Sequence, residues 1–290
     1  MKWFNVVSAG LVVWPIVSAI PTASNSHDGE GSGPYPAYYF SEPTLENHTI
    51  YMPKNPARDL SLPVLVWAEG GCDNNGTQFA NFLSNIASYG FVVVANGPIN
   101  GGGSDVENPQ YLRDSVLWIS AKAGTCGKYK NVDASKIAAA GQSCGGLEAY
   151  TMRNDSRVSY LGIFNSGFLS NVPAGALPTN IVVEPPSTIT QVHKPVFYFL
   201  GGPTDVAYPQ GEADYHNLTG VPKWIGNYPV GHSGTYSEVN GGAFGVAAVN
   251  WLTWIFKDNK TASKFFTEGG AEKAGWNETE SYDLQDLSNY

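Results

Sequence analysis

The amino-acid sequence predicts an α/β protein, in which a doubly wound, mostly parallel sheet is flanked by helices in a single domain. Short apolar runs recur along the chain and are nearly continuous, which is typical of strands buried on both faces of a sheet. Segments with apolar residues at helical spacing lie between these runs. Strands that alternate with helices imply right-handed crossovers, and ligand sites then lie at the carboxyl ends of the strands.

The expected elements follow one another in this alternating order. The helix before the second strand has apolar residues at 79, 82, 83 and 86, and the last helix has them at 244, 247, 248, 251, 252 and 255. Each of these segments can bury one stripe against the sheet. The runs that we interpret as strands cover residues 63–68, 91–95, 136–140, 158–164, 195–200 and 224–228.

The start of the chain has the pattern of a signal peptide. Lys2 precedes an apolar stretch over 6–17, and small residues lead to Ala19. Pro15 and the polar run over 22–28 leave this stretch too short for a membrane anchor, which needs about 20 apolar residues. We therefore expect cleavage after Ala19 and a secreted, extracellular protein that does not act at a membrane.

The remaining chain divides by composition. Residues 20–35 are rich in Ser, Gly, Pro and Asp, so we expect a flexible leader there. The main α/β domain is expected over 36–267, and the acidic end over 268–290 is interpreted as a peripheral tail.

Charge and glycosylation patterns limit the partners. The formal net charge of −9 repels phosphate backbones, so nucleic acid is not an expected partner.

Three cysteines are too few for a scaffold built from disulfides, although they allow one bridge and one spare thiol. Asn-x-Ser/Thr patterns, which fit a glycosylated eukaryotic protein, begin at Asn47, Asn75, Asn154, Asn217, Asn259 and Asn277.

The segment around Ser143 has the pattern of a nucleophile. Residues 141–145 form Gly-x-Ser-x-Gly, directly after the expected strand over 136–140 and before a helical segment through Met152. In such a strand–turn–helix the serine is held in a strained turn with its hydroxyl presented to solvent, and a side chain at either glycine would clash. The alternative is an ordinary serine in a glycine-rich turn.

The acid and the base of a catalytic triad would follow Ser143 along the chain. Asp205 follows the run over 195–200 and is the expected acid, with Glu212 and Asp214 as competitors farther along. Three histidines lie downstream of Ser143. We reject His193 because it precedes its strand, and His216 because it adjoins a glycosylation pattern, which leaves His232.

His232 is the expected general base. It lies in a loop after the strand candidate over 224–228 and before the last helix, where its imidazole can reach Ser143 while Asp205 fixes its tautomer. The alternative is a surface histidine in a glycine-rich loop. No further cluster of His with Asp or Cys has the spacing of metal ligands, so we expect neither a metal nor another cofactor.

Acyl transfer also needs donors for the carbonyl oxygen that becomes negative. The backbone N–H of Cys144 is the first candidate, and that of Cys72, in the loop after the strand over 63–68, is the second. If both backbone N–H groups face one oxyanion, Cys72 and Cys144 are neighbours and could form a disulfide. The alternative is that both are small buried thiols. Cys126 precedes the expected strand over 136–140, at the opposite end of the sheet, and is not expected to pair.

At this point the sequence resembles the cutinase-like polyester hydrolases of the α/β-hydrolase superfamily, a group related to dienelactone hydrolases. The residues that carry the resemblance are Ile86-Ala87-Ser88-Tyr89-Gly90-Phe91-Val92-Val93, Val249-Asn250-Trp251-Leu252 and Phe256-Lys257-Asp258-Asn259-Lys260-Thr261, together with the three catalytic loops. The resemblance covers roughly residues 60 to 267 and implies a secreted, fungal-type member with the α/β-hydrolase fold.

The resemblance also implies which residues contact the substrate. It supports the triad and the two oxyanion donors, and it puts Phe168 where the family has a stacking aromatic residue. Gly71 and Val206, together with Phe168, are assigned to substrate binding. The sequence departs from the family at Cys72 and Cys144, where the family has Tyr or Phe and Met. The Pro-rich stretch over 171–194 is longer than in the family and is interpreted as a flap over the site.

The sequence therefore predicts a monomeric serine hydrolase that cleaves a small or polymeric carboxylic ester through an acyl-enzyme intermediate. Cutin-like polyesters, short-chain acyl esters and cell-wall esters are all candidate substrates, because a fold resemblance cannot choose among them. Two alternatives stay open. An amidase or peptidase would use the same triad, and a secreted binding protein could retain the fold without catalysis.

Overall fold

The structure is a computed structural model that describes residues 1, 26–102, 108, 110–170, 177–178, 181 and 183–290. The expected signal peptide lies outside the described residues, except Met1, as does the leader from 20 to 25. No helix among the described residues is long and apolar enough to cross a membrane.

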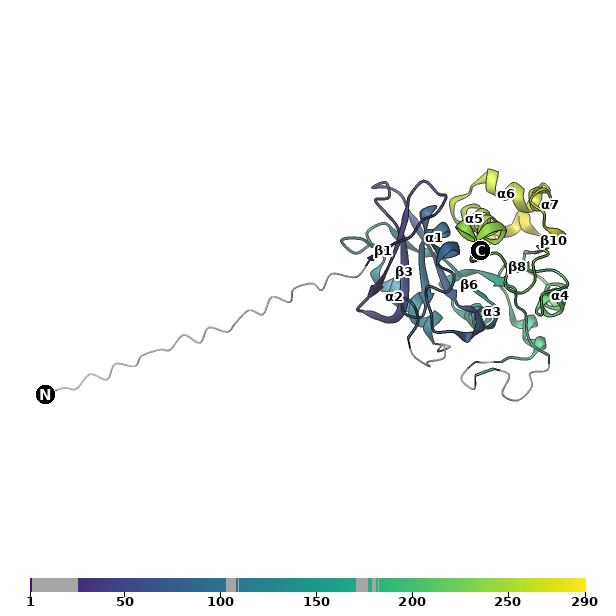
Figure 1. The fold of residues 1–290 in the computed structure, drawn as a ribbon, viewed down its shortest axis with the longest axis horizontal. Helices are drawn as coiled ribbons and strands as arrows, with labels where there is room; N and C mark the ends of the chain where they lie inside the picture. The colour runs from purple at the N-terminus through teal and green to yellow at the C-terminus, as the bar shows by residue number, and fades with distance from the viewer. Residues whose placement is uncertain (2–25, 103–107, 109, 171–176, 179–180, 182) are drawn as a thin grey trace.

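The described residues form one sheet of ten strands, in the spatial order β1-β2-β3-β5-β4-β6-β7-β8-β9-β10 (Figure 1). Strands β5, β4, β6, β7, β8 and β9 pair in parallel, and the strands at both ends are antiparallel. The bounds are β1 (Ser26–Asp28), β2 (Ala37–Glu42), β3 (Leu45–Pro53), β4 (Leu62–Ala68), β5 (Val92–Asn96), β6 (Val132–Gln142), β7 (Val158–Phe164), β8 (Val196–Leu200), β9 (Lys223–Asn227) and β10 (Asn277–Tyr282).

Helices cover both faces of this sheet. Their bounds are α1 (Ala80–Ser88), α2 (Tyr111–Lys122), α3 (Cys144–Thr151), α4 (Tyr208–Asn217), α5 (Gly242–Lys257), α6 (Lys260–Thr267) and α7 (Gly270–Lys273). Short 3-10 helices are η1 (Gly70–Cys72), η2 (Met152–Asn154), η3 (Pro186–Gln191), η4 (Val239–Gly241) and η5 (Leu284–Asn289).

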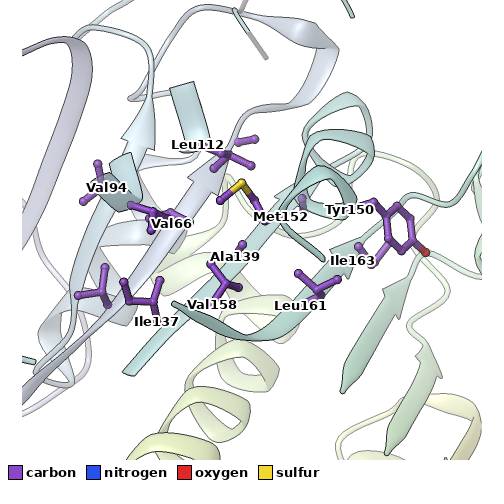
Figure 2. Close-up of a cluster of buried hydrophobic side chains, with 14 of the residues drawn as sticks. Val66, Val94, Leu112, Ile137, Ala139, Tyr150, Met152, Val158, Leu161 and Ile163 are labelled. Atoms are coloured by element: carbon purple, nitrogen blue, oxygen red, sulfur yellow. The ribbon is translucent and has the colours of Figure 1, made fainter. Parts of the chain in front are cut away.

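The sheet separates two hydrophobic cores, because alternate side chains of each strand point to opposite faces. One core holds Leu112 of α2 and Tyr150 of α3, which pack on strand residues such as Val66 and Ile163 (Figure 2). The other core holds residues of α1, α5 and α6, with Trp67 and Trp251 among its largest fully buried side chains. Full burial of a Val, Leu, Ile, Phe or Met side chain in these cores contributes about 1.5–3 kcal/mol.

The α/β architecture and its six parallel strands agree with the apolar runs in the sequence. Two differences lie at the sheet's ends. Residues 26–35, expected as part of a flexible leader, instead include β1, and the Ser32 backbone N–H donates to Asn85 of α1 at 2.9 Å. Short turns and side-chain hydrogen bonds hold this segment, although it has no apolar period.

The acidic end, expected as a peripheral tail, is likewise folded onto the domain. Strand β10 pairs with β9, and η5 buries Leu284 and Leu287 at 7% and 6% exposure. The Tyr160 hydroxyl donates to the Leu287 carbonyl at 2.9 Å. Folded structure therefore extends past residue 267. The expectation failed because β10 lies at an edge, where most of its side chains face solvent and leave no apolar pattern.

Candidate active site

Ser143 lies in a sharp turn between β6 and α3. Its φ of 53° and ψ of −113° are rare for a residue with a side chain. A Cβ at Gly145 would lie 2.1 Å from the Ala68 carbonyl oxygen, and one at Gly141 would lie 2.3 Å from the Gly145 backbone. Only glycine fits on either side, so the close approach of β4 and α3 depends on both.

The turn brings Ser143 to a histidine that lies 89 residues further along the chain. The His232 Nε2 lies 2.8 Å from the Ser143 Oγ, and the Nδ1 of the same ring lies 2.6 Å from the Asp205 Oδ1. Because β6, β8 and β9 are parallel, the loops that follow them meet at one edge. The three residues expected as a triad therefore form one hydrogen-bonded chain.

Asp205 is buried, with 2% of its surface exposed. Burial alone would raise its pKa, but hydrogen bonds from His232, the Ala207 N–H, Asn165 and the Gly201 N–H outweigh this effect and hold the pKa below its ordinary value. The Ala207 N–H donates to Oδ1 at 2.9 Å. The carboxylate is thus kept ionised and fixed in orientation.

Two residues that sequence reasoning missed extend this chain into the core. The Asn165 Nδ2 donates to the second oxygen of Asp205 at 2.8 Å, and the Tyr236 hydroxyl donates to the Asn165 Oδ1. Both side chains are buried. Asn165 directly follows β7 at the carboxyl edge of the sheet, and that position is the signal that could have found it. Nothing in the sequence marks Tyr236.

The expected oxyanion donors lie side by side beside Ser143. Cys72 and Cys144 form a disulfide with their Cα atoms 5.2 Å apart, so the predicted bridge is present. Cys144 is the first residue of α3, where backbone N–H groups have no partner within the helix. Cys126 is free and exposed.

A cavity of about 270 Å³ opens over Ser143 and His232. Gly71 and Val206, two of the residues assigned to substrate binding, line it together with Leu147, Leu169, Leu177 and Pro178. His232 is the only ionisable side chain among its described lining residues. Leu177 and Pro178 belong to the expected flap, and Ile181 of the same stretch packs on the disulfide. The lining is mainly apolar.

Phe168 does not have the predicted role. Its side chain is 2% exposed and stacks on Tyr150 in the core, with ring centres 4.0 Å apart, and it does not line the cavity. Its backbone N–H donates to the Asp214 Oδ2 at 2.7 Å, which turns the residue inward. The apolar wall of the site comes instead from leucines at 147, 169 and 177.

The competing acids and histidines lie elsewhere. Asp214 accepts from the Tyr150 hydroxyl at 2.8 Å, below the site, and its burial raises its pKa to about 7. Glu212 binds Asn227 and lies 3.4 Å from His216 on the surface of α4. His193 is exposed before β8. None of these side chains contacts Ser143 in the described structure.

The glycosylation patterns mostly lie at the surface. Asn75 is half-buried, and its Oδ1 accepts hydrogen bonds from Thr77. The other five asparagines, at 47, 154, 217, 259 and 277, are exposed. Within the part of the chain that the structure describes, no group of three or more His, Cys, Asp or Glu side chains could hold a metal ion.

Comparisons with known proteins give no family for this chain. No protein-family model matches it, and no curated protein matches it. The arrangement around Ser143 therefore has to be interpreted from its own geometry.

Proposed function

We propose that the chain is a secreted serine hydrolase of the α/β-hydrolase fold that cleaves carboxylic esters. The observation that carries the proposal is the hydrogen-bonded chain from Asp205 through His232 to Ser143, at a strained strand–turn–helix that opens into a cavity. The order of the strands and the resemblance to cutinase-like polyester hydrolases are compatible with it.

The geometry supports a two-step reaction. His232 Nε2 removes the proton from the Ser143 hydroxyl as the oxygen attacks the ester carbonyl, and Asp205 stabilises the imidazolium that forms. The N–H groups of Cys72 and Cys144 would stabilise the oxyanion. The protonated His232 then gives its proton to the leaving alcohol. In the second step it activates water, which cleaves the acyl-serine.

The lining of the cavity favours an uncharged substrate. Three leucine side chains and one valine side chain line the cavity, and burying a charged group against them would be costly. Val206 is 73% exposed beside the catalytic acid, so apolar surface continues outside the cavity. This pattern suits an apolar ester, either a small one or a segment of a polymer such as cutin or a cell-wall ester.

The first experiment is hydrolysis of p-nitrophenyl esters, from acetate to long chains, by the wild type and by Ser143→Ala. We expect the wild type to turn over the esters and the variant to lose at least about 10⁴-fold in kcat while its circular dichroism is unchanged. Retained turnover in the variant would overturn the role of Ser143. Activity on amides alone would indicate an amidase, and inactivity on both classes would favour a binding protein.

A further inference from the structure

A second groove lies at the opposite edge of the sheet from Ser143. It has a volume of about 630 Å³. Leu62 begins β4 and residues 127–131 precede β6, so the groove lies at the amino ends of the parallel strands. The proposed catalytic loops follow the carboxyl ends. The groove is therefore separate from the candidate active site.

The walls of this groove carry a concentration of positive charge in an acidic chain. Lys54 and Arg58 come from the loop between β3 and β4, and Lys128 and Lys130 come from the loop before β6. Asp28 is the only acidic residue among the described lining residues. Since the whole chain has a formal charge of −9, this is a site where an anion is attracted rather than repelled.

Half of these cations already have partners. Lys54 contacts Asp28 at 2.5 Å, and Lys128 contacts Glu42 at 3.1 Å and lies 3.8 Å from the centre of the Phe40 ring. Arg58 and Lys130 are exposed and form no ion pair with another described residue. Charge on both walls therefore remains available to a ligand.

The floor between the walls is partly apolar and firmly held. Tyr38 is half-buried and stacks on Phe40, with ring centres 5.3 Å apart, and Pro53 and Pro56 also line the groove. The two loops are joined because the Asn131 Nδ2 donates to the carbonyls of residues 57 and 58 at 3.2 and 3.0 Å. These hydrogen bonds hold the two loops together without a ligand.

We propose that this groove binds an oligosaccharide whose sugar rings carry carboxylates. A sugar ring has an apolar face that suits Tyr38 and the prolines, and its carboxylates would pair with Arg58 and Lys130. Phosphate groups are commonly bound at helix N-termini, and no α-helix begins among the described lining residues. An apolar floor with cations on both sides fits an acidic sugar chain better than a free phosphate.

The test measures binding of an oligogalacturonate to the full protein by isothermal titration calorimetry, with a neutral galactan oligomer of equal length beside it. We expect the acidic oligomer to bind, its affinity to fall with added salt, and the neutral oligomer not to bind. Arg58→Glu with Lys130→Glu should weaken binding at least about tenfold, or ~1.4 kcal/mol. Arg58→Gln with Lys130→Gln should weaken it less.

The matched control is Arg113→Glu with Lys273→Glu, two exposed cations outside the groove that give the same change in net charge. Unchanged affinity in the control supports the site, and an equal loss overturns it. Absence of oligogalacturonate binding, binding of the neutral oligomer, or equally tight binding of polyaspartate or inorganic phosphate would each overturn it too. Turnover of p-nitrophenyl esters, if present, should be the same in all these variants.

Discussion

At Ser143 the chain holds a backbone conformation that its surroundings have to maintain. A positive φ at a residue with a side chain costs of order 1–3 kcal/mol. The Ser143 N–H donates to the Phe164 carbonyl at 2.9 Å, and Ser166 donates to the Ser143 carbonyl at 2.6 Å. These bonds come from β7 and its following loop. The strand next to β6 and the loop after it therefore maintain the strained conformation of Ser143.

Tyr236 tests whether the buried hydrogen bonds behind Asp205 orient it. Tyr236→Phe leaves the Asn165 Oδ1 without its donor, which costs about 1–3 kcal/mol of stability, and frees Asn165 to turn away from Asp205. We expect kcat on p-nitrophenyl esters to fall about 3- to 10-fold with little change in KM. The loss should be larger at acid pH, because the pKa of Asp205 rises when a donor is lost.

The control removes a buried tyrosine hydroxyl far from the site. Tyr129 donates to Glu42 at 2.6 Å, near the other groove, so Tyr129→Phe should lower the melting temperature without changing kcat or its pH profile. If both variants lose stability and neither changes kcat, Tyr236 is merely structural.

Sequence reasoning located the residues whose role follows from position along a strand. Ser143, Asp205 and His232 follow strands with clear apolar runs, so their common edge could be predicted. Phe168 could not be placed, because its direction is set by one hydrogen bond to Asp214 across the core. Tyr236 acts through a contact that joins residues 71 positions apart.

Among the elements, η1 and α3 are joined covalently by the disulfide at the candidate oxyanion site. The bond links residues 72 positions apart and fixes the two backbone N–H groups relative to each other. Disulfides typically stabilise the folded state by about 2–4 kcal/mol. Ile181 covers the bond on one side, which leaves the disulfide largely buried.

Removal of the disulfide should therefore affect both stability and turnover. We expect Cys72→Ser with Cys144→Ser to lower the free energy of unfolding by about 2–4 kcal/mol and kcat by about tenfold or more, because the oxyanion donors are less well placed. Cys126→Ser is the matched control and should change neither quantity. A stability loss with unchanged kcat would show that the bond does not position the donors.

The apolar pattern predicted the parallel strands and missed the antiparallel ones at the two ends of the sheet. The expected strand over 158–164 coincides with β7. The one over 195–200 differs from β8 by one residue at its start, and the one over 224–228 differs from β9 by one residue at each end. Strands β2 and β3 were not predicted; only two of the six positions of β2, Ala37 and Phe40, are fully buried. Edge strands carry little hydrophobic signal, which is why β1 and β10 were missed too.

For the whole molecule, Asp214 should make stability depend on pH. Burial raises its pKa to about 7 from an ordinary value of 3.8, so the folded state binds this proton more tightly than the unfolded state does. Its contribution is therefore most favourable below about pH 4 and is lost as the pH rises through about 7. The direction is opposite to that expected for an ion-paired carboxylate.

Asp214→Asn removes this dependence while keeping an oxygen that can accept from Tyr150 and the Phe168 N–H. We expect the stability of the variant relative to the wild type to be greater at pH 8 than at pH 5, by about 2–4 kcal/mol, measured by urea unfolding. Asp59→Asn, at an exposed position, is the control and should follow the wild type. Parallel pH profiles for the wild type and Asp214→Asn would contradict the assignment.

The two ends of the sheet have a consequence for the protein at high concentration. Exposed backbone groups of an edge strand can pair with another chain and begin aggregation. Here β1 is only three residues long, and β10 has a register irregularity and exposed glutamates at 278 and 280. A second chain would gain few hydrogen bonds at one edge and meet charge repulsion at the other. The short strand β1 and the acidic strand β10 therefore disfavour fibril-like assembly of the protein.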